Sequence, residues 1–518
     1  MQTDRVLILD FGSQTTQLIA RRVRELGVYC EIWPCTSSLD KIKAFSPRAL
    51  ILSGGPASVH ESGSPRPDQG IWSLGLPVLG ICYGMQVMVE MNDGRVQPAG
   101  HREFGRAALD IKDASGPFLG LPATIDVWMS HGDQVTVLPS SFRVLASSAT
   151  CPYAAVVDDT RRFYGVQFHP EVMHTNDGKH MLERFVCDVA GAQKTWKMSA
   201  FIVDKVAEIK QVVGEQRVIM AISGGVDSSV AATLIHKAIG SQLTAVYVDH
   251  GLHRQGEIEA VQRIFKDGLH MDVRIVDARD RFFAVLEGVI DPEQKRKRIG
   301  HVFIDVFDDV ARGLPGAAFL GQGTLYPDVI ESVSFHGGPS AVIKSHHNVG
   351  GLPERMNLRL LEPLRELFKD EVRALGRELG LDAAVVQRQP FPGPGLAIRV
   401  LGEVTRARCE LLQKADAIIR HEIDEALRTK AIDVPGLWQW FGVLLPVKSV
   451  GVMGDARTYD ETVCVRCVSS TDGMTADWAD LPHALLSRVS NRIINEVRGV
   501  NRVVYDISSK PPATIEWE

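Results

Sequence analysis

Hydrophobic and polar positions in the first part of the chain form short apolar runs separated by longer amphipathic stretches. Apolar runs occupy residues 5–11, 48–55 and 76–84, and each contains or meets glycine. Such runs are typical of buried parallel strands, and the amphipathic stretches between them are typical of helices that cover a sheet. The pattern predicts an α/β domain with a largely parallel sheet.

This pattern lapses near residues 190–198 and then resumes. Apolar runs at residues 217–223 and 243–251 flank an apolar helical stretch, which predicts a second α/β domain with a largely parallel sheet. A segment rich in proline and glycine, FPGPGLAIR, follows Pro390 and predicts a second boundary.

Beyond that boundary the pattern changes to a mixture of helix and strand. A helical pattern covers residues 410–428, and strand-like runs cover residues 443–454, 462–468 and 502–508. This mixture predicts a smaller α+β domain. A chain of 518 residues fits about three domains at roughly 150 residues each. We predict domains at residues 1–195, 196–393 and 394–518.

Composition and charge limit the partners and the cell compartment that we expect for the protein. The net charge of -6 gives no general attraction to nucleic acid or anionic lipid, so neither is an expected partner. The first apolar run is too short for a signal peptide or a membrane span, and Asp10 interrupts it. Eight scattered cysteines indicate reduced thiols and a cytoplasmic protein. We interpret Cys464 and Cys467, a lone C-x-x-C, as packed strand residues and not as a metal or redox site.

The first candidate for chemistry is Cys82, in the sequence Gly80-Ile81-Cys82-Tyr83-Gly84. A G-x-C-x-G sequence between an apolar strand and a helical stretch predicts a nucleophile elbow with cysteine as nucleophile. Glycines permit the sharp turn, and the helix N-terminus favours a thiolate. The alternative is a buried structural cysteine.

Two further strand ends supply the groups that such a nucleophile requires. The segment GVQFHPE ends a strand in His169 and Glu171, a base and the carboxylate that orients it. The segment SGGP ends another strand with glycines, so its backbone can provide one oxyanion donor, with the N–H of Tyr83 as the other.

Together SGGP, GICYG and GVQFHPE resemble the class I glutamine amidotransferases over residues 5–189. The resemblance implies that Cys82 attacks glutamine, that His169 transfers the proton and that Glu171 orients His169. It also implies the remaining parts of that site, which are an oxyanion hole at Gly55 and Tyr83 and a glutamine pocket lined by Gln86 and by Ser130-His131-Gly132-Asp133.

A second constellation follows the strand at residues 217–223. The segment SGGVDSS offers glycines, hydroxyls and a helix N-terminus to phosphate oxygens, but it lacks the lysine of a Walker A loop. It resembles the PP-loop of ATP pyrophosphatases. This resemblance implies that ATP is a co-substrate, that Asp227 holds Mg²⁺ and that Val248 lies near adenine. The implied ATP-binding residues of the loop are Ser223, Gly224, Gly225, Val226, Asp227, Ser228 and Ser229.

Segments across the whole chain resemble the family of glutamine-hydrolysing GMP synthetases. They include KSHHNVGGLPE, FPGPGLAIRVLGE, SVGVMGDARTYD and KPPATIEWE. The resemblance implies a purine-biosynthetic ligase that adenylates the C2 oxygen of xanthosine 5′-monophosphate (XMP) and replaces AMP with ammonia from glutamine. It further implies a homodimer that forms through residues 394–518.

The same resemblance assigns the residues of the acceptor site. Acidic residues at 328 and 331 are followed by a glycine-rich polar loop and then by a lysine and two histidines, which suggests a lid over a charged intermediate. The alternative is a solvated surface loop. The basic run at residues 295–298 is as well explained by a solvated helix face as by contact with the nucleotide. The implied XMP-binding residues are Arg296, Gln439, Lys510 and Glu516, and the implied lid residues are Asp328, Glu331, Lys344, His346 and His347.

Two other functions remain open at this point. The first is a PP-loop amidotransferase with a different acceptor, such as a carboxylate. The second is a catalytically silent scaffold that binds nucleotide or glutamine, a class that usually lacks the nucleophile or its base.

Overall fold

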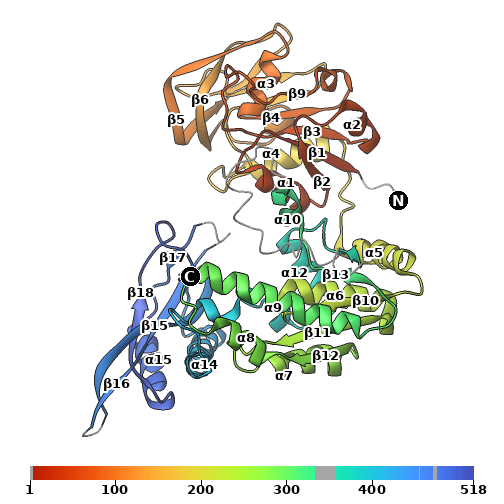
Figure 1. The fold of residues 1–518 in the computed structure, drawn as a ribbon. Coiled ribbons are helices and arrows are strands. Elements are labelled where there is room, and N and C mark those ends of the chain that lie inside the picture. The colour runs from red at the N-terminus through yellow and green to blue at the C-terminus, as the bar shows by residue number, and fades with distance from the viewer. Residues whose placement is uncertain (1–3, 333–357, 454–455, 471–474) are drawn as a thin grey trace. The chain divides into compact units, whose positions relative to one another are not determined.

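The structure is a computed structural model that describes residues 4–332, 358–453, 456–470 and 475–518. These residues divide into two compact units (Figure 1). Among the described residues, the first unit comprises those up to Phe201 together with residues 330–332, and the second comprises Ile202–Val329 and the residues from 358 onward. The first unit contains one sheet and the second contains two, and each unit has its own core. No helix in the described ranges is both long enough and apolar enough to cross a membrane.

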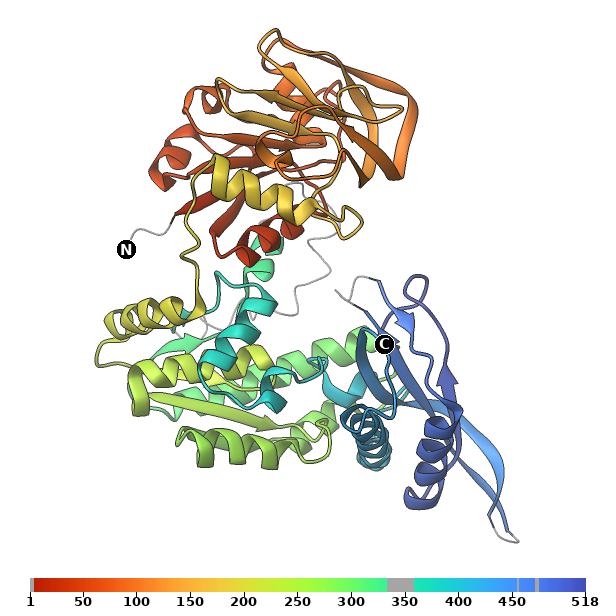
Figure 2. The ribbon, with the colours of Figure 1, turned by 180° about the vertical axis from the view of Figure 1, so that it is seen from behind.

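The first unit is built on a nine-stranded sheet in the order β2-β1-β3-β4-β9-β8-β7-β5-β6 (Figures 1 and 2). The five strands from β2 to β9 in this order are parallel, and the remaining strands are antiparallel. The strands are β1 (Arg5–Asp10), β2 (Tyr29–Pro34), β3 (Ala49–Leu52), β4 (Val78–Ile81), β5 (Arg95–Ile111), β6 (Thr124–Val137), β7 (Arg143–Ser147), β8 (Ala155–Asp158) and β9 (Phe163–Val166).

Helices cover the parallel part of this sheet, which explains why its strands are apolar on both faces. All four residues of β3 and of β4 are buried, and helix α1 turns Ile19, Ala20 and Val23 inward. The helical elements are α1 (Thr16–Glu25), α2 (Leu39–Phe45), η1 (Gln69–Ser73), α3 (Tyr83–Glu90), η2 (Gly116–Phe118), α4 (Gly178–Glu183) and η3 (Arg184–Val189).

The second unit contains a five-stranded parallel sheet in the order β12-β11-β10-β13-β14. Its strands are β10 (Arg217–Ala221), β11 (Leu243–Asp249), β12 (Asp272–Asp277), β13 (Ala317–Gly321) and β14 (Arg359–Leu361). Helix α5 (Met198–Val213) leads into this unit. The other helical elements are α6 (Val226–Ile239), η4 (Gly240–Gln242), α7 (Glu257–Val261), η5 (Gln262–Gly268), α8 (Arg279–Leu286), α9 (Pro292–Arg312), α10 (Tyr326–Ser332), α12 (Lys369–Glu378), α13 (Ala383–Val386) and η7 (Gly395–Ile398). Helix α10 begins in this unit, and its last residues, from Ile330, are grouped with the first unit.

A third, smaller sheet follows in the same unit. Strand β16 is its centre and pairs antiparallel with β15 and β17 and parallel with β18. The elements are α14 (Arg406–Arg428), β15 (Leu437–Met453), β16 (Ala456–Ser469), β17 (Asp477–Trp478), α15 (His483–Glu496) and β18 (Val500–Asp506). The predicted fold class is confirmed: two largely parallel α/β sheets precede a smaller sheet with helices.

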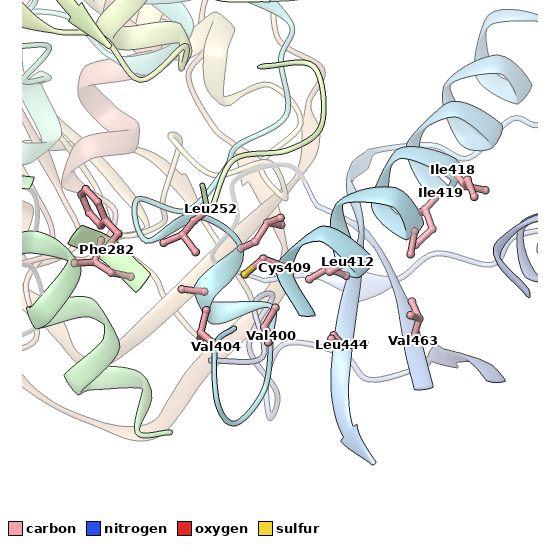
Figure 3. Close-up of a cluster of buried hydrophobic side chains, with 14 of the residues drawn as sticks. Leu252, Phe282, Val400, Val404, Cys409, Leu412, Ile418, Ile419, Leu444 and Val463 are labelled. Carbon is pink, nitrogen blue, oxygen red and sulfur yellow. The ribbon is translucent and has the colours of Figure 1, made fainter. Parts of the chain in front are cut away.

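One apolar cluster continues from the five-stranded sheet to the third sheet. Figure 3 shows Leu252 and Phe282 at one end of this cluster, Cys409 and Leu412 of α14 in its middle, and Val463 of β16 beyond them. Contacts alone therefore do not divide the second unit, and the predicted boundary between residues 393 and 394 stays a prediction.

The two cysteines of the C-x-x-C sequence lie on β16. Both are buried, and burial raises the pKa of each thiol to about 12. They belong to different apolar clusters, since residues three apart on a strand face opposite sides of the sheet. This packing agrees with their interpretation as strand residues.

Candidate active sites

The first site lies where the carboxyl ends of β1, β3, β4 and β9 meet at one edge of the sheet. Cys82 follows β4 with φ 50° and ψ −108°, a strained conformation for a residue with a side chain. Its N–H donates to the carbonyl of Val166 at the end of β9 (2.8 Å), and α3 begins at Tyr83. The strand, turn and helix predicted around Cys82 are therefore present.

Close packing explains the glycines on either side of this turn. A Cβ atom at Gly84 would lie 2.4 Å from the carbonyl oxygen of Leu52, and one at Gly80 would lie 2.7 Å from Cα of Met85. Any larger side chain would push α3 away from the sheet. The glycines thus fix the position of Cys82, the predicted nucleophile.

His169 and Glu171 form a hydrogen-bonded pair just beyond β9. Nδ1 of His169 lies 2.7 Å from Oε1 of Glu171, and the hydroxyl of Thr15 donates to the same oxygen (2.7 Å). Burial disfavours the charged imidazole, but hydrogen bonds with Cys82 and Glu171 outweigh burial and raise the pKa of His169 to about 10. The site therefore favours an imidazolium beside the sulfur.

A buried amide also contacts the sulfur of Cys82. Nε2 of Gln167 lies 3.6 Å from Sγ, and the carbonyl of Ser130 lies 3.5 Å from it. Gln86 donates to Oε1 of Gln167 (3.2 Å) and to the carbonyl of Asp133 (2.9 Å). The Gln86 amide nitrogen is thus bonded within the protein, and it supports Gln167, which contacts the sulfur of Cys82.

His131, a predicted pocket residue, is held on both ring nitrogens. Nδ1 lies 3.1 Å from the carbonyl of Asp133, and Nε2 lies 3.2 Å from Oε2 of Glu103. Burial lowers the pKa of His131, and Glu103 opposes that effect only in part. Next to a protonated His169, a neutral His131 avoids a second buried positive charge.

The predicted oxyanion segment lies against the same residues. A Cβ atom at Gly54 would lie 3.1 Å from Cε1 of His169, and one at Gly55 would lie 3.3 Å from Cδ1 of Tyr83. The Tyr83 hydroxyl donates to the carbonyl of Pro65 (2.9 Å) and anchors the ring. The structure therefore brings the backbone of this turn close to His169 and Tyr83.

The second site is the turn between β10 and α6 in the second unit. Gly224 has φ 70°, and the hydroxyls of Ser223 and Ser228 lie 3.1 Å apart at the start of the helix. The buried Ser229 donates to the carbonyl of Gly225 (2.7 Å) and closes the turn from inside. The loop thus presents hydroxyls and a helix N-terminus at the carboxyl edge of a parallel sheet, where phosphate groups bind.

Asp227 is the predicted metal ligand of this loop. Its Oδ2 forms an ion pair with Lys369 of α12, and its Oδ1 is buried without a hydrogen-bond partner among the described residues. The structure has no cluster of three or more acidic, histidine or cysteine side chains in the described ranges that would bind a metal unaided. The single open carboxylate oxygen fits an ion whose other ligands are phosphate oxygens and water.

The sequence motifs did not identify Arg388, which also contacts the loop. Its Nη1 donates to the carbonyl of Gly224 (2.6 Å), and its Nη2 forms an ion pair with Glu257. Val248, expected near adenine, is buried at the end of β11, where its carbonyl lies 2.9 Å from Nε2 of His253.

The four predicted XMP-binding residues lie in the second unit. Gln439 is buried on β15, and its Oε1 has no partner among the described residues. Glu516 accepts two hydrogen bonds from Arg399 (3.0 and 2.7 Å). Arg296 donates to the main-chain oxygen of Glu518 (2.7 Å), and the backbone of Lys510 pairs with that of Ala476.

Only one predicted lid side chain belongs to the described part of the chain. Asp328 accepts a hydrogen bond from the N–H of Leu325 (2.9 Å) at the start of α10. Glu331 lies on the same helix, but the position of its side chain is not described. Lys344, His346 and His347 lie outside the described residues.

Three family matches cover most of the chain. Residues 7–189 match Glutamine amidotransferase class-I, residues 196–299 match NAD synthase, and residues 425–517 match the GMP synthase C terminal domain. A solved structure of a putative GMP synthase subunit from Thermoplasma acidophilum is 33% identical, covering 37% of this chain and 96% of that chain with a TM-score of 0.34.

Curated relatives match from end to end. The proteins named "GMP synthase [glutamine-hydrolyzing]" from Rhizobium etli and Phenylobacterium zucineum are each 58% identical over 99% of both chains. The protein of that name from Brucella melitensis is 56% identical over the same share. The chain belongs to the glutamine-hydrolysing GMP synthase family.

Proposed function

We propose that this protein makes GMP from XMP, ATP and glutamine, and releases AMP, pyrophosphate and glutamate. The observation that carries this proposal is the full-length likeness to relatives with that name. The geometry supports it, because a nucleophile with its base and a phosphate-binding loop occur in the same chain. ATP use is a property of this family of ligases.

In the first unit Cys82 is the nucleophile. Its sulfur attacks the carboxamide carbon of glutamine, and His169 gives a proton to the departing nitrogen, so that ammonia and a glutamyl thioester form. His169 then takes a proton from water, which attacks the thioester and releases glutamate. Glu171 orients the imidazole, and the backbones of Gly55 and Tyr83 stabilise the oxyanion. Ser130 and His131 line the glutamine pocket.

In the second unit the loop at residues 223–229 holds the phosphates of ATP. The C2 oxygen of XMP attacks the α-phosphorus and pyrophosphate leaves, which converts a poor leaving group into AMP. Ammonia then attacks C2, and AMP departs. Mg²⁺, bound through Asp227 and phosphate oxygens, would neutralise charge that builds up on pyrophosphate. Lys510 suits the phosphate of XMP, and Glu516 suits its base or ribose.

Product analysis tests this proposal. Purified protein with XMP, ATP and glutamine should form GMP, AMP, pyrophosphate and glutamate in equal amounts. The same assay with a carboxylate acceptor in place of XMP tests the main alternative. AMP formed with the carboxylate, and no GMP formed from XMP, would overturn the choice of acceptor.

We further propose a homodimer in the cytoplasm. Apolar side chains that are exposed together on a surface favour association with another protein. The β15–β16 hairpin exposes four such side chains, Val447, Val450, Val452 and Tyr459. All eight cysteines are free, which suits a reducing compartment. Sedimentation equilibrium should give the mass of two chains, and the mass of a single chain across the concentration range would contradict the dimer.

A further inference from the structure

The segment 508–518, called the tail segment below, has little regular structure to hold it in place. Strand β18 ends at Asp506, and the only β-bridge described within the tail segment joins Lys510 to Ala476. Two backbone hydrogen bonds of 2.7 and 3.1 Å form that bridge. Within the segment, the N–H of Ala513 also donates to the carbonyl of Ser509 (3.1 Å). These few bonds leave the segment dependent on contacts with side chains elsewhere in the unit.

Three fully buried cations make those contacts, and the first is Arg466 of β16. Its guanidinium donates to the carbonyls of Ser508 (2.6 Å) and Thr514 (3.2 Å), and it lies 3.3 Å from the carboxylate of Asp506. One side chain thus ties both ends of the turn between residues 508 and 514. Each carbonyl that it holds lacks a partner in a β-ladder.

The second cation, Arg399, follows helix η7 and holds Glu516. Its Nε and Nη2 donate to both carboxylate oxygens of Glu516, and its guanidinium lies 3.8 Å from the ring centre of Phe441. A bidentate pair of this kind fixes the direction of the carboxylate and leaves a lone pair on each oxygen for another donor.

The third cation is Lys295 of α9. Its Nζ donates to the carbonyls of Ala397 (3.2 Å) and Val400 (2.9 Å), and it forms an ion pair with the carboxylate of Glu518. Burial lowers the pKa of Lys295, and Glu518 opposes this shift. A charge buried this completely is costly unless it is paired, so Lys295 and the tail segment stabilise each other.

Two buried side chains of this unit, Arg399 and Gln439, each keep one hydrogen-bonding atom open within the described part of the chain. Nη1 of Arg399 and Oε1 of Gln439 are buried and have no partner among the described residues. Gln439 donates to the carbonyl of Pro390 (3.3 Å), and Arg399 lies 5.2 Å from the ring centre of the adjacent Phe391. Arg399 thus keeps an open donor beside Glu516, and Gln439 keeps an open acceptor, for a polar ligand.

We propose that Lys295, Arg399 and Arg466 are positioning residues that set the conformation of the tail segment, so that Glu516 and Lys510 face XMP. The ion pair between Lys295 and Glu518 is the removable part of this framework, because neither residue is assigned to the nucleotide. This inference rests on the proposed function, since XMP is the ligand that the tail segment would hold.

Substitution of the ion pair tests the inference in the full-length protein with ammonia as nitrogen donor. Lys295→Met, Glu518→Gln and the double variant should each raise KM for XMP about tenfold or more, with kcat and KM for ATP within about twofold of wild type. Lys297→Met is the matched control, because Lys297 is an exposed member of the same basic run. Hydrogen exchange in the tail segment should be faster in the three variants than in the control.

The double variant separates positioning from general stability. It leaves no unpaired buried charge, so its thermal stability should recover towards wild type while its KM for XMP stays raised. A KM that returns to the wild-type value together with stability would overturn the inference, as would an unchanged KM in Glu518→Gln. A wild-type protein that makes no GMP would instead contradict the proposed function, and the exchange of the tail segment would still decide whether the ion pair orders it.

Discussion

At the scale of single residues, the geometry of the first site depends on the side-chain carboxylate of Glu171. Oε1 of Glu171 is shared by Nδ1 of His169 and the hydroxyl of Thr15, while Oε2 is buried without a partner among the described residues. A buried carboxylate with one bonded oxygen relies strongly on each donor that it has. We therefore expect the Thr15 hydroxyl to hold Glu171 in the position that orients His169.

Removal of the Thr15 hydroxyl should slow glutamine hydrolysis. We expect Thr15→Val to lower glutaminase kcat about tenfold or more, because a hydrogen bond to an ionised group contributes about 1.5–3 kcal/mol. GMP formation from ammonia should stay unchanged. Thr124→Val, which removes an exposed hydroxyl from the same unit, is the control. Equal glutaminase rates in both variants would show that Thr15 does not orient the pair.

The protonation of His169 gives a pH-dependent prediction. Glu171 is one of the groups that raise the pKa of His169 to about 10, so the imidazolium is present below that pH and is lost above it. Glu171→Gln removes this support while burial still acts, so the pKa should fall. The alkaline limit of glutaminase kcat/KM should then move to lower pH. An unshifted profile would mean that Glu171 does not set the charge of His169.

At the scale of elements, both sites use a turn from a buried parallel strand into a helix. In the first unit β4 leads through Cys82 into α3, and in the second β10 leads through the loop into α6. The glycine at the second turn has φ 70°, and a Cβ atom there would lie 2.8 Å from Nη1 of Arg388. The turn therefore depends on the contact with Arg388 as well as on the backbone conformation.

Gly224 and Gly240 lie at opposite ends of α6, and both have a positive φ. Only at Gly224 would an added Cβ atom also meet Arg388. Gly224→Ala should lower GMP formation at least about tenfold with either nitrogen donor, because it strains the turn and displaces Arg388. Gly240→Ala, at the other end of α6, meets nothing within 4 Å and should cost only about 1–3 kcal/mol of stability, with synthesis retained. Similar synthetic rates in both variants would contradict the role given to the loop.

Elements were more predictable from sequence than contacts were. Apolar runs followed by glycine identified β1, β3, β4, β10 and β11, because burial on both faces leaves a clear signal. Thr15, Gln167 and Arg388 were missed, since they meet their partners across 156, 85 and 164 residues and no local pattern encodes such contacts. The tail segment resembled a known family, and Arg399 lies in the family-like segment FPGPGLAIRVLGE. No pattern in the sequence showed that Arg399, Arg466 and Lys295 would contact the tail segment.

At the scale of the whole molecule, two compact units carry two different chemistries. The first carries the proposed nucleophile, base and oxyanion turn, and the second carries the proposed phosphate-binding loop and the buried cations that contact the tail segment. Neither unit by itself carries all the residues that we propose for the formation of GMP from XMP, ATP and glutamine. Ammonia is the product of the first reaction and a substrate of the second, so we expect each reaction to proceed by the residues of its own unit.

The most direct test is Cys82→Ala, assayed for GMP with XMP and ATP under two nitrogen sources. The substitution removes the nucleophile and leaves every residue of the second unit in place. GMP formation from glutamine should fall to background, and formation from added ammonia should match wild type. Retention of the glutamine-dependent rate, or equal loss of both activities in a variant that still folds, would contradict the proposal that the first unit hydrolyses glutamine and the second makes GMP.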